Sequence, residues 1–377
     1  MPACGPSHGE LHFLPLARPV PDGAGEFRLP SPEQPFVRGV VTTPVGEVPR
    51  VEARLDRADR RGAWLARWDI GRMRFTVEPG LYALGRPDPD APVLVTANYK
   101  MSFDVLRSAL PGRDLWILVL DTRGINVWCA AGKGTFGTME LLDRIRASRL
   151  DEVVRHRRLI VPQLGAPGLA AHEIRKHSGF RVIYGPVQAS DVPRFLDDGC
   201  RARPGMRRKR FPFRERLVLV PVELVQALRI GLVAILVLLL AAGLAPGISF
   251  AAGVHRYGLP MTLAILAGIL AGTVLTPLLL PWLPGRMFSV KGALAGLASF
   301  PAVLVPGPWW QGMGRMETAA LLLVSLAAAS WFGMAFTGAS TYTSLNGVRR
   351  EMLRAIPAQF SALVIGLGMW LLVVYGR

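Results

Sequence analysis

The chain has 377 residues, of which 51% are hydrophobic, and this length predicts two domains rather than one. Its formal net charge of +17 is typical of nucleic-acid-binding proteins, but the densest basic cluster directly precedes the first long apolar run, where such residues fix membrane topology and contact anionic lipid. A nucleic-acid partner is therefore not expected, and an odd set of three distant cysteines (Cys4, Cys129 and Cys200) implies no disulfide framework and predicts a reducing, cytoplasmic environment.

Composition divides the chain into four segments. Residues 1–35 are rich in Pro and Gly and predict a flexible tail, with no signal peptide pattern. Residues 36–200 carry charges of both signs and predict a folded soluble domain. Residues 201–223 form a basic linker that contains Arg201, Arg203, Arg207, Arg208, Lys209, Arg210, Arg214 and Arg216. Long Leu, Ala, Val and Gly runs at 224–377 predict a transmembrane domain.

The soluble segment alternates short apolar runs with amphipathic stretches. Strands are predicted at 92–97, 115–120, 125–129, 159–162 and 181–184, and helices at 101–110, 138–149 and 170–177. This alternation is typical of an α/β, Rossmann-like domain with a parallel-rich sheet. Ligands of such sheets bind beyond the carboxyl ends of the strands. Three loops of small residues follow strands there and are expected to line one cavity: 96–100, 126–138 and 163–168.

The C-terminal segment predicts an all-α membrane domain of about five helices. A spanning helix needs ~20 mostly apolar residues, and the candidates are 224–245, 259–281, 290–308, 318–338 and 358–375. The third is the weakest, because Pro301 and Pro306 interrupt it. If the chain crosses the membrane five times, the segments on the same side as residue 216 contain thirteen Lys and Arg, and those on the opposite side contain three. By the positive-inside rule, this asymmetry predicts an inner-membrane protein whose soluble domain faces the cytoplasm. No Asp, Glu or His lies deep in a span, so an anchor is favoured over a transporter.

A glycine-rich loop at 132–137 (GKGTFG) fits the G-x-G-x-x-G pattern of dinucleotide sites, between a predicted strand and a predicted helix. The acidic residue expected after the next strand is missing, because Gln163 stands there. A Walker A loop does not fit, since Val127 and Gly134 occupy its Gly and Ser/Thr positions. A nucleotide site and a structural turn both remain open for this loop.

Cys129 also has two interpretations. A lone cysteine is most often an inert, buried side chain. This one is predicted to end a strand, follows Trp128 and precedes a run of small residues that allows close approach of a ligand. It also lies near the N-terminus of the predicted 138–149 helix, whose dipole favours a thiolate. From these features alone, packing and function are equally consistent.

The segment 126–133, NVWCAAGK, resembles the signature of the mercury-methylating corrinoid proteins, the HgcA family. The resemblance continues at 70–73, 77–85, 93–104, 134–138 and 163–168, and in the order of a soluble domain followed by about five spans. The soluble domain is more distantly similar to the corrinoid domain of the corrinoid iron–sulfur protein large subunit.

The resemblance implies a cobalt corrinoid of the cobalamin type, with Cys129 as the lower axial ligand of cobalt. It implies that segment 126–133 covers the lower face of the corrinoid, through Asn126, Val127, Trp128, Cys129, Ala130, Ala131, Gly132 and Lys133. Thr96, Gly165 and Ala166 are expected in the same pocket. The implied activity is methyl transfer to Hg(II) in an anaerobic host. The implied partners are a ferredoxin-like protein with two [4Fe–4S] clusters and a methyltransferase that supplies the methyl group from a folate-type donor.

The axial ligand can be examined through the histidines. Corrinoid proteins with a histidine lower ligand carry Asp-x-His-x-x-Gly, and no histidine has that context here: His8, His12, His156, His172, His177 and His255. A thiolate donates more electron density than histidine, which suits an electrophilic acceptor such as Hg(II). A methyl carrier with a different acceptor, and a nucleotide-dependent membrane protein, remain as alternatives.

Overall fold

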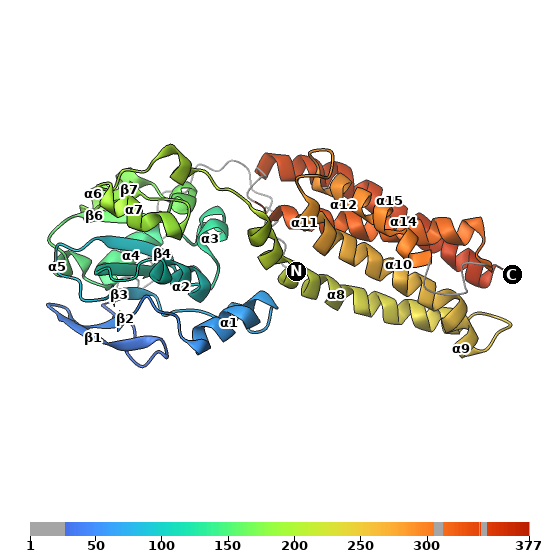
Figure 1. The fold of residues 1–377 in the computed structure, drawn as a ribbon, viewed down its shortest axis with the longest axis horizontal. Coiled ribbons are helices and arrows are strands. Elements are labelled where there is room, and N and C mark those ends of the chain that lie inside the picture. Colours follow the sequence, from blue (N-terminus) through green and yellow to red (C-terminus); the bar gives the residue numbers. More distant parts are fainter. Residues whose placement is uncertain (1–26, 305–311, 339, 341–344, 377) are drawn as a thin grey trace. The chain divides into compact units, whose positions relative to one another are not determined.

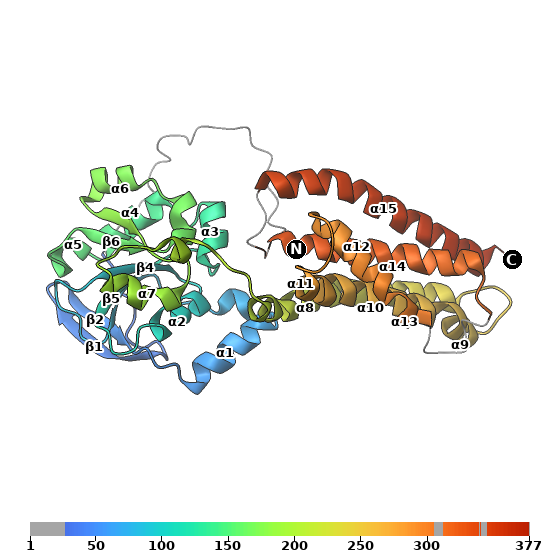
Figure 2. The same ribbon diagram turned by 45° about the horizontal axis from the view of Figure 1, so that its top comes forward.

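A computed structural model describes residues 27–304, 312–338, 340 and 345–376. These residues form two compact units, an α/β unit of residues 27–66 and 70–210 and a helical unit from residue 211 onward (Figures 1 and 2). Most of the predicted tail lies outside the described residues. Its described part is tied to the α/β unit, because the Arg28 amide donates to the Ala147 carbonyl at 2.9 Å. The α/β unit therefore begins before residue 36.

The α/β unit contains a seven-stranded, mostly parallel sheet in the order β1-β2-β3-β5-β4-β6-β7. Its strands are β1 (Val37–Thr43), β2 (Gly46–Val51), β3 (Gly80–Leu84), β4 (Val93–Ala97), β5 (Leu115–Leu120), β6 (Arg158–Val161) and β7 (Arg181–Tyr184). Four of the predicted strands are confirmed as β4 to β7. The strand predicted at 125–129 is wrong, because this segment is a turn that leads into a helix, α3 (Val127–Lys133).

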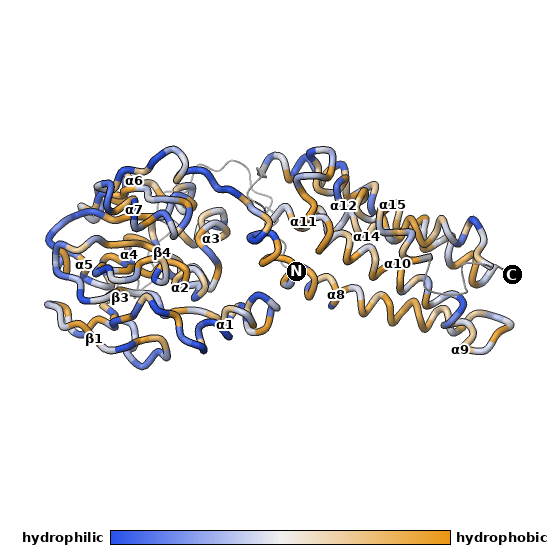
Figure 3. The backbone as a smooth tube through the Cα atoms, viewed as in Figure 1, coloured by the Kyte–Doolittle hydropathy of each residue, from blue (hydrophilic) through white to orange (hydrophobic). Residues whose placement is uncertain are grey.

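Both faces of the central strands are covered, as their apolar runs predict (Figure 3). Val95 packs into a cluster with α4 (Thr138–Ala147) and α6 (Ala171–Ser178). Its neighbour Leu94 packs into a second cluster on the other face. That face is covered by α2 (Lys100–Ser108) and α7 (Val192–Asp197). The two remaining helices of the unit are α1 (Arg57–Arg67) and α5 (Leu150–Val153).

The sheet has a topological switch point at β4. Strands β5, β4, β6 and β7 are mutually parallel, and the chain leaves β4 for β5 on one side and returns to β6 on the other. In doubly wound sheets a crevice opens outside the carboxyl ends of the strands at this point, and ligands bind there. The segments that follow β4, β5 and β6 meet at this edge, as predicted.

The helical unit contains four helices, among the described residues, that are long and apolar enough to cross a membrane: Phe213–Gly243, Phe250–Leu279, Arg315–Gly338 and Asn346–Tyr375. The first is α8 (Phe213–Gly243). The second joins α9 (Phe250–Gly253), α10 (Leu259–Leu270) and α11 (Thr276–Leu279) through two π-helical turns, and α14 (Arg315–Ala335) and α15 (Leu345–Tyr375) form most of the last two.

The predicted third span is not one long helix. It is divided into α12 (Phe288–Ser299) and α13 (Pro301–Leu304), because Pro301 has no backbone N–H to continue the ladder; residues 305–308 lie outside the described residues. Glycines show how α12 packs. A Cβ at Gly292 would lie 2.3 Å from the Ala329 carbonyl, and one at Gly296 would lie 2.7 Å from the Ala329 side chain. α12 thus lies against α14, although it is not long enough to be one of the four candidate membrane-spanning helices among the described residues.

Candidate functional site

The carboxyl ends of β4 and β5 are joined by Asn98. Its buried side-chain amide donates to the Asp121 carboxylate at 3.1 Å. Its carbonyl oxygen accepts from the Thr122 amide at 3.1 Å, the Thr122 hydroxyl at 2.8 Å and the Gly124 amide at 3.0 Å. This one side chain therefore fixes the turn that leads from β5 into α3. Sequence analysis assigned Asn98 to an edge loop but did not predict this role.

α3 is a short helix with a defined start and end. Asn126 is its N-cap, and the Asn126 side-chain oxygen accepts a hydrogen bond from the Cys129 amide at 2.9 Å. Gly134 ends the helix in the left-handed conformation, at φ 80°, where glycine has no Cβ to clash. The cap places Cys129 in the first helical turn, whose dipole favours negative charge. The dipole near Cys129 is thus that of α3 rather than that of the 138–149 helix.

The two faces of α3 differ in exposure. Ala130 and Ala131 are buried in the core of the α/β unit, and Val127 packs against the same core. The other face presents Trp128, which is 39% exposed, half-buried Cys129, and exposed Gly132 and Lys133. Cys129 and Gly132 are neighbours on this face, because residues three apart lie one above the other on a helix. A Cβ at Gly132 would have no neighbour within 4 Å, so the surface beside the thiol is open.

The predicted loop 163–168 supports α3 from the core side. It forms a 3₁₀ helix, Gln163–Gly168, in which Gly165 is buried and Ala166 half-buried. A Cβ at Gly165 would lie 2.5 Å from the Phe136 ring. A Cβ at Gly168 would lie 2.1 Å from the Phe136 carbonyl and 3.2 Å from the Ala131 Cα. The structure therefore brings these two predicted loops into contact, and only glycine allows it.

Thr96 is less closely associated with α3. It is buried in β4 and is paired with Val119 of β5. Its strand neighbours Val95 and Ala97 belong to the cluster that holds α3, so Thr96 points to the opposite face of the sheet. Its predicted contact with the corrinoid stays a prediction.

A buried charge cluster lies beside this edge, and sequence analysis missed it. Lys100 contacts Asp59 at 2.6 Å and Asp104 at 2.7 Å, and Arg107 contacts the same two carboxylates at 2.6 and 2.8 Å. Burial raises the pKa of Asp59, but hydrogen bonds from Lys100 and Arg107 outweigh it and hold this pKa below its ordinary value. The cluster joins α1 to α2 and fixes the chain directly after β4. The long sequence separation of Asp59 from Lys100 gave no signal for it.

In the described part of the chain, no group of three or more His, Cys, Asp and Glu side chains is placed to hold a metal ion. The predicted metal contact is different in kind, a single sulfur ligand to a cofactor's cobalt. The glycine-rich segment 132–137 does not form the single loop that a dinucleotide site needs. Gly132 lies inside α3, and Gly134 and Gly137 lie between α3 and α4. The strand-to-helix turn that a dinucleotide fingerprint needs is therefore not present at this loop.

Known proteins resemble the part of the chain that builds this edge. Residues 71–196 match the family model of the CO dehydrogenase/acetyl-CoA synthase delta subunit. The acetyl-CoA decarbonylase/synthase complex subunit gamma of Methanopyrus kandleri is 32% identical over 123 residues, which are 32% of this chain and 26% of the relative. The same subunit of Methanothermobacter thermautotrophicus is 34% identical over 123 residues (32% and 26%), and that of Archaeoglobus fulgidus is 32% identical over 128 residues (33% and 27%).

The family match covers β3 to β7 with α3 and its supports. The chain spans about a quarter of the length of the curated relatives. They agree with the predicted similarity of the soluble domain to the corrinoid iron–sulfur protein large subunit. The finer resemblance, to the mercury-methylating proteins, remains a prediction.

Proposed function

We propose that the α/β unit binds a corrinoid at the β4 edge, with the Cys129 sulfur as lower axial ligand of cobalt, and that the protein transfers a methyl group to Hg(II). The observation that carries this proposal is the outer face of α3. There a half-buried thiol lies beside a glycine with open space above it, at the switch point of a doubly wound sheet. The resemblance of segment 126–133 to the mercury-methylating corrinoid proteins supports the choice of acceptor.

The residues present fit a flat cofactor. A planar macrocycle can approach the Cys129 sulfur because Gly132 has no side chain and no neighbour stands where one would be. Trp128, which is 39% exposed, precedes Cys129 on α3 and adds an exposed apolar surface at this edge. Cys129 lies in the first turn of α3, where the helix dipole favours negative charge. Lys133, at the last turn of α3, adds a positive charge on the same face.

The roles of the chain follow from this arrangement. Asn126 fixes the first turn of α3 and so the direction of the Cys129 side chain. Ala130 and Ala131 hold the helix against the core, and Gly168 allows the closest approach of its support. When bound, the corrinoid supplies the cobalt centre that carries the methyl group. A sulfur ligand donates electron density toward that centre, which suits an electrophilic acceptor such as Hg(II).

The proposal extends to partners and location. The relatives are subunits of a complex by their names, which supports protein partners for this chain as well. We assign them as a ferredoxin-like protein with two [4Fe–4S] clusters and a methyltransferase that supplies the methyl group. Arg286, Lys291, Arg350 and Arg354 gather at one end of the helical unit. By the positive-inside rule this end faces the cytoplasm, which makes the chain a multi-pass inner-membrane protein.

The second candidate is a methyl carrier that uses the same cofactor and the same Cys129 but a different acceptor. It is favoured by the relatives, whose names assign them to an acetyl-CoA decarbonylase/synthase complex rather than to mercury chemistry. The two candidates share the site and differ only in the acceptor. Assays of methyl transfer to Hg(II) and to other acceptors therefore separate them.

The experiment uses the full chain, purified without oxygen and supplied with cobalamin, in wild-type, Cys129→Ala, Cys129→His and Cys200→Ala forms. Cys200→Ala is the matched control, because Cys200 is the other described thiol, lies after α7 rather than in α3, and has its pKa raised by burial. We expect sulfur coordination by X-ray absorption and methylmercury formation in the wild type and the control, and loss of both in the Cys129 variants. Near-normal methylmercury formation in either Cys129 variant contradicts the proposal.

A further inference from the structure

The helical unit contains a cavity of about 490 Å³ that is separate from the β4 edge. It lies between the α11–α12 turn and the first turns of α15, and its walls include four cations, Arg286, Lys291, Arg350 and Arg354, against one carboxylate, Glu351. Such an excess of positive charge around one cavity indicates an anionic ligand.

The two buried charges of the cavity are already used by the fold. The Lys291 ammonium donates to the Leu280 carbonyl at 2.7 Å and to the Leu283 carbonyl, so it closes the end of α11. Glu351, which is 7% exposed, accepts from the Ser289 amide at 2.6 Å at the start of α12. Glu351 is therefore held by the backbone and does not form an ion pair with the arginines.

The three arginines remain available. Among the described residues, Arg286, Arg350 and Arg354 make no hydrogen bond or ion pair, and all three are exposed at the mouth of the cavity. Guanidinium groups bind phosphate through paired, charge-assisted hydrogen bonds. Arg350 and Arg354 are four residues apart on α15, so both project from one face of the helix.

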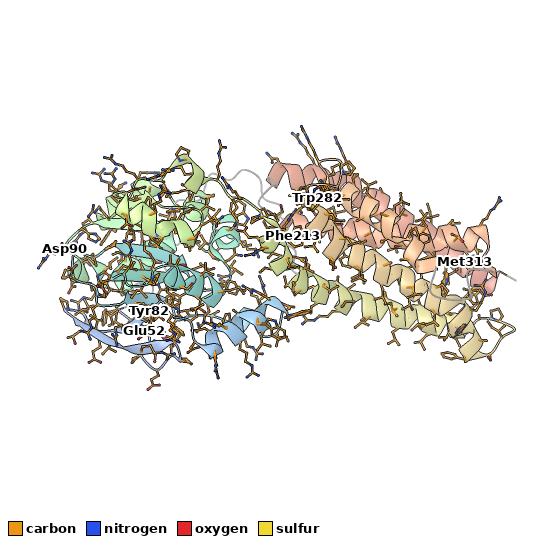
Figure 4. The ribbon with its side chains drawn as sticks, viewed as in Figure 1. Glu52, Tyr82, Asp90, Phe213, Trp282 and Met313 are labelled. Atoms are coloured by element: carbon orange, nitrogen blue, oxygen red, sulfur yellow. The ribbon has the colours of Figure 1, made fainter. Side chains whose placement is uncertain are left out.

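The rest of the wall is mostly apolar and lies beside the end of α11, in the second of the apolar helices. Phe288 is buried there, next to the charged mouth. Trp282, in the turn before α12, is 70% exposed and lies at one end of the helical unit, with Met313 at the other (Figure 4). Exposed tryptophan at the end of an apolar helix is typical of the headgroup level. Cations above an apolar wall suit a ligand with a phosphate and an attached acyl chain.

We propose that this cavity binds a phosphate group, in the form of an anionic phospholipid headgroup, through Arg286, Arg350 and Arg354. The same chemistry would accept free inorganic phosphate, which lacks the acyl chain that the apolar wall suits. The site is independent of Cys129 and of the corrinoid. A full chain that never binds a corrinoid can still be tested for it.

The test titrates the full chain in a non-ionic detergent with two probes, dihexanoyl-phosphatidylglycerol below its micellar concentration and inorganic phosphate. Native mass spectrometry counts bound ligand. We expect saturable binding of the lipid, weakened about tenfold or more in the Arg350→Gln/Arg354→Gln double variant, since each charge-assisted bond contributes strongly. Arg349→Gln is the matched control, because Arg349 is the exposed neighbour of Arg350 on α15 and does not line the cavity.

Two further variants sharpen the outcome. Arg286 lies in a turn rather than in a helix, so Arg286→Gln tests the site even if the double variant on α15 does not fold. We expect Arg286→Gln to weaken lipid binding. Glu351→Gln keeps the oxygen that accepts from Ser289 and removes the one negative charge, so it strengthens binding. Lipid binding with this pattern supports a headgroup, and phosphate binding with this pattern supports the same site with a free anion. Binding of neither probe, or equal loss in Arg349→Gln, overturns the proposal.

Discussion

A substitution at Gly132 can block the approach of a ligand to α3 without destabilising the helix. It lies inside the helix, one residue before its end, and a Cβ there would have no neighbour within 4 Å. Gly132→Leu therefore removes no packing contact. It replaces the residue with the highest conformational cost in a helix by a good helix former, which adds up to about 1 kcal/mol to the free energy of unfolding.

The same change closes the surface beside the thiol. A helical side chain leans toward the N-terminus and covers the preceding turn, and three residues before Gly132 lies Cys129. A leucine at this position would keep a planar cofactor away from the sulfur. We expect at least a tenfold loss of corrinoid affinity, which is about 1.4 kcal/mol, in a protein that is no less stable.

The assay is an anaerobic titration with cobalamin followed by visible absorption, beside urea unfolding of the same preparations. Gly132→Ala should give an intermediate affinity. Gly368→Leu is the control, since Gly368 is an exposed glycine inside α15 that also has no neighbour within 4 Å. Wild-type affinity and sulfur coordination in Gly132→Leu would refute the proposed approach of the cofactor to α3.

The supports of α3 and the buried charge cluster give three more expected outcomes. Asn126→Ala removes the acceptor of the Cys129 amide and should cost about 1 kcal/mol, measured as lost hydrogen-exchange protection in α3; unchanged protection contradicts the cap. Gly168→Ala places a Cβ 2.1 Å from the Phe136 carbonyl and should lower the free energy of unfolding, measured in urea, by about 1–3 kcal/mol. An unchanged free energy of unfolding would contradict the need for glycine at this contact. Because the Asp59 pKa is lowered in the folded state, its stabilisation is complete above the unfolded pKa of about 3.9 and is lost as the pH falls through the folded pKa. Urea unfolding from pH 7 to pH 2 should therefore show a smaller acid loss in Asp59→Asn, which is already about 3 kcal/mol less stable at pH 7 because it leaves buried cations uncompensated; identical pH profiles contradict this.

The central strands could be predicted because they are buried on both faces. β5 is a continuous apolar run, β4 is interrupted only by Thr96, and every residue of both strands is buried. β1 gave no such signal, since all of its residues are exposed or half-buried and an arginine and a glycine interrupt it. The edge loops were placed correctly because parallel strands bring their carboxyl ends to one side of a sheet. The charge cluster of Asp59, Lys100 and Arg107 depends on tertiary contacts that no local pattern records.

The third membrane segment shows the limit of counting apolar residues. The stretch 290–308 is apolar enough to suggest a span, but Pro301 ends the helical ladder of α12. Within the described part of this stretch, up to residue 304, no single helix is long enough to span a membrane. Its packing against α14 depends instead on Gly292 and Gly296, which allow two backbones to approach closely. The two glycines four residues apart, Gly292 and Gly296, therefore predict the packing of this segment better than its apolar length does.

The error at 125–129 matters most for function, because the two conformations place Cys129 differently. In a strand, side chains alternate, so Cys129 would share a face with Val127 and with Ala131. In α3 it shares a face with Gly132, while Ala131 is turned into the core. Val127 and Trp128 favour a strand by propensity, but Asn126 and Gly134 stand at the cap positions on either side of the segment. The caps determine the conformation here, and with it the open surface beside the thiol on which the proposed cobalt ligand depends.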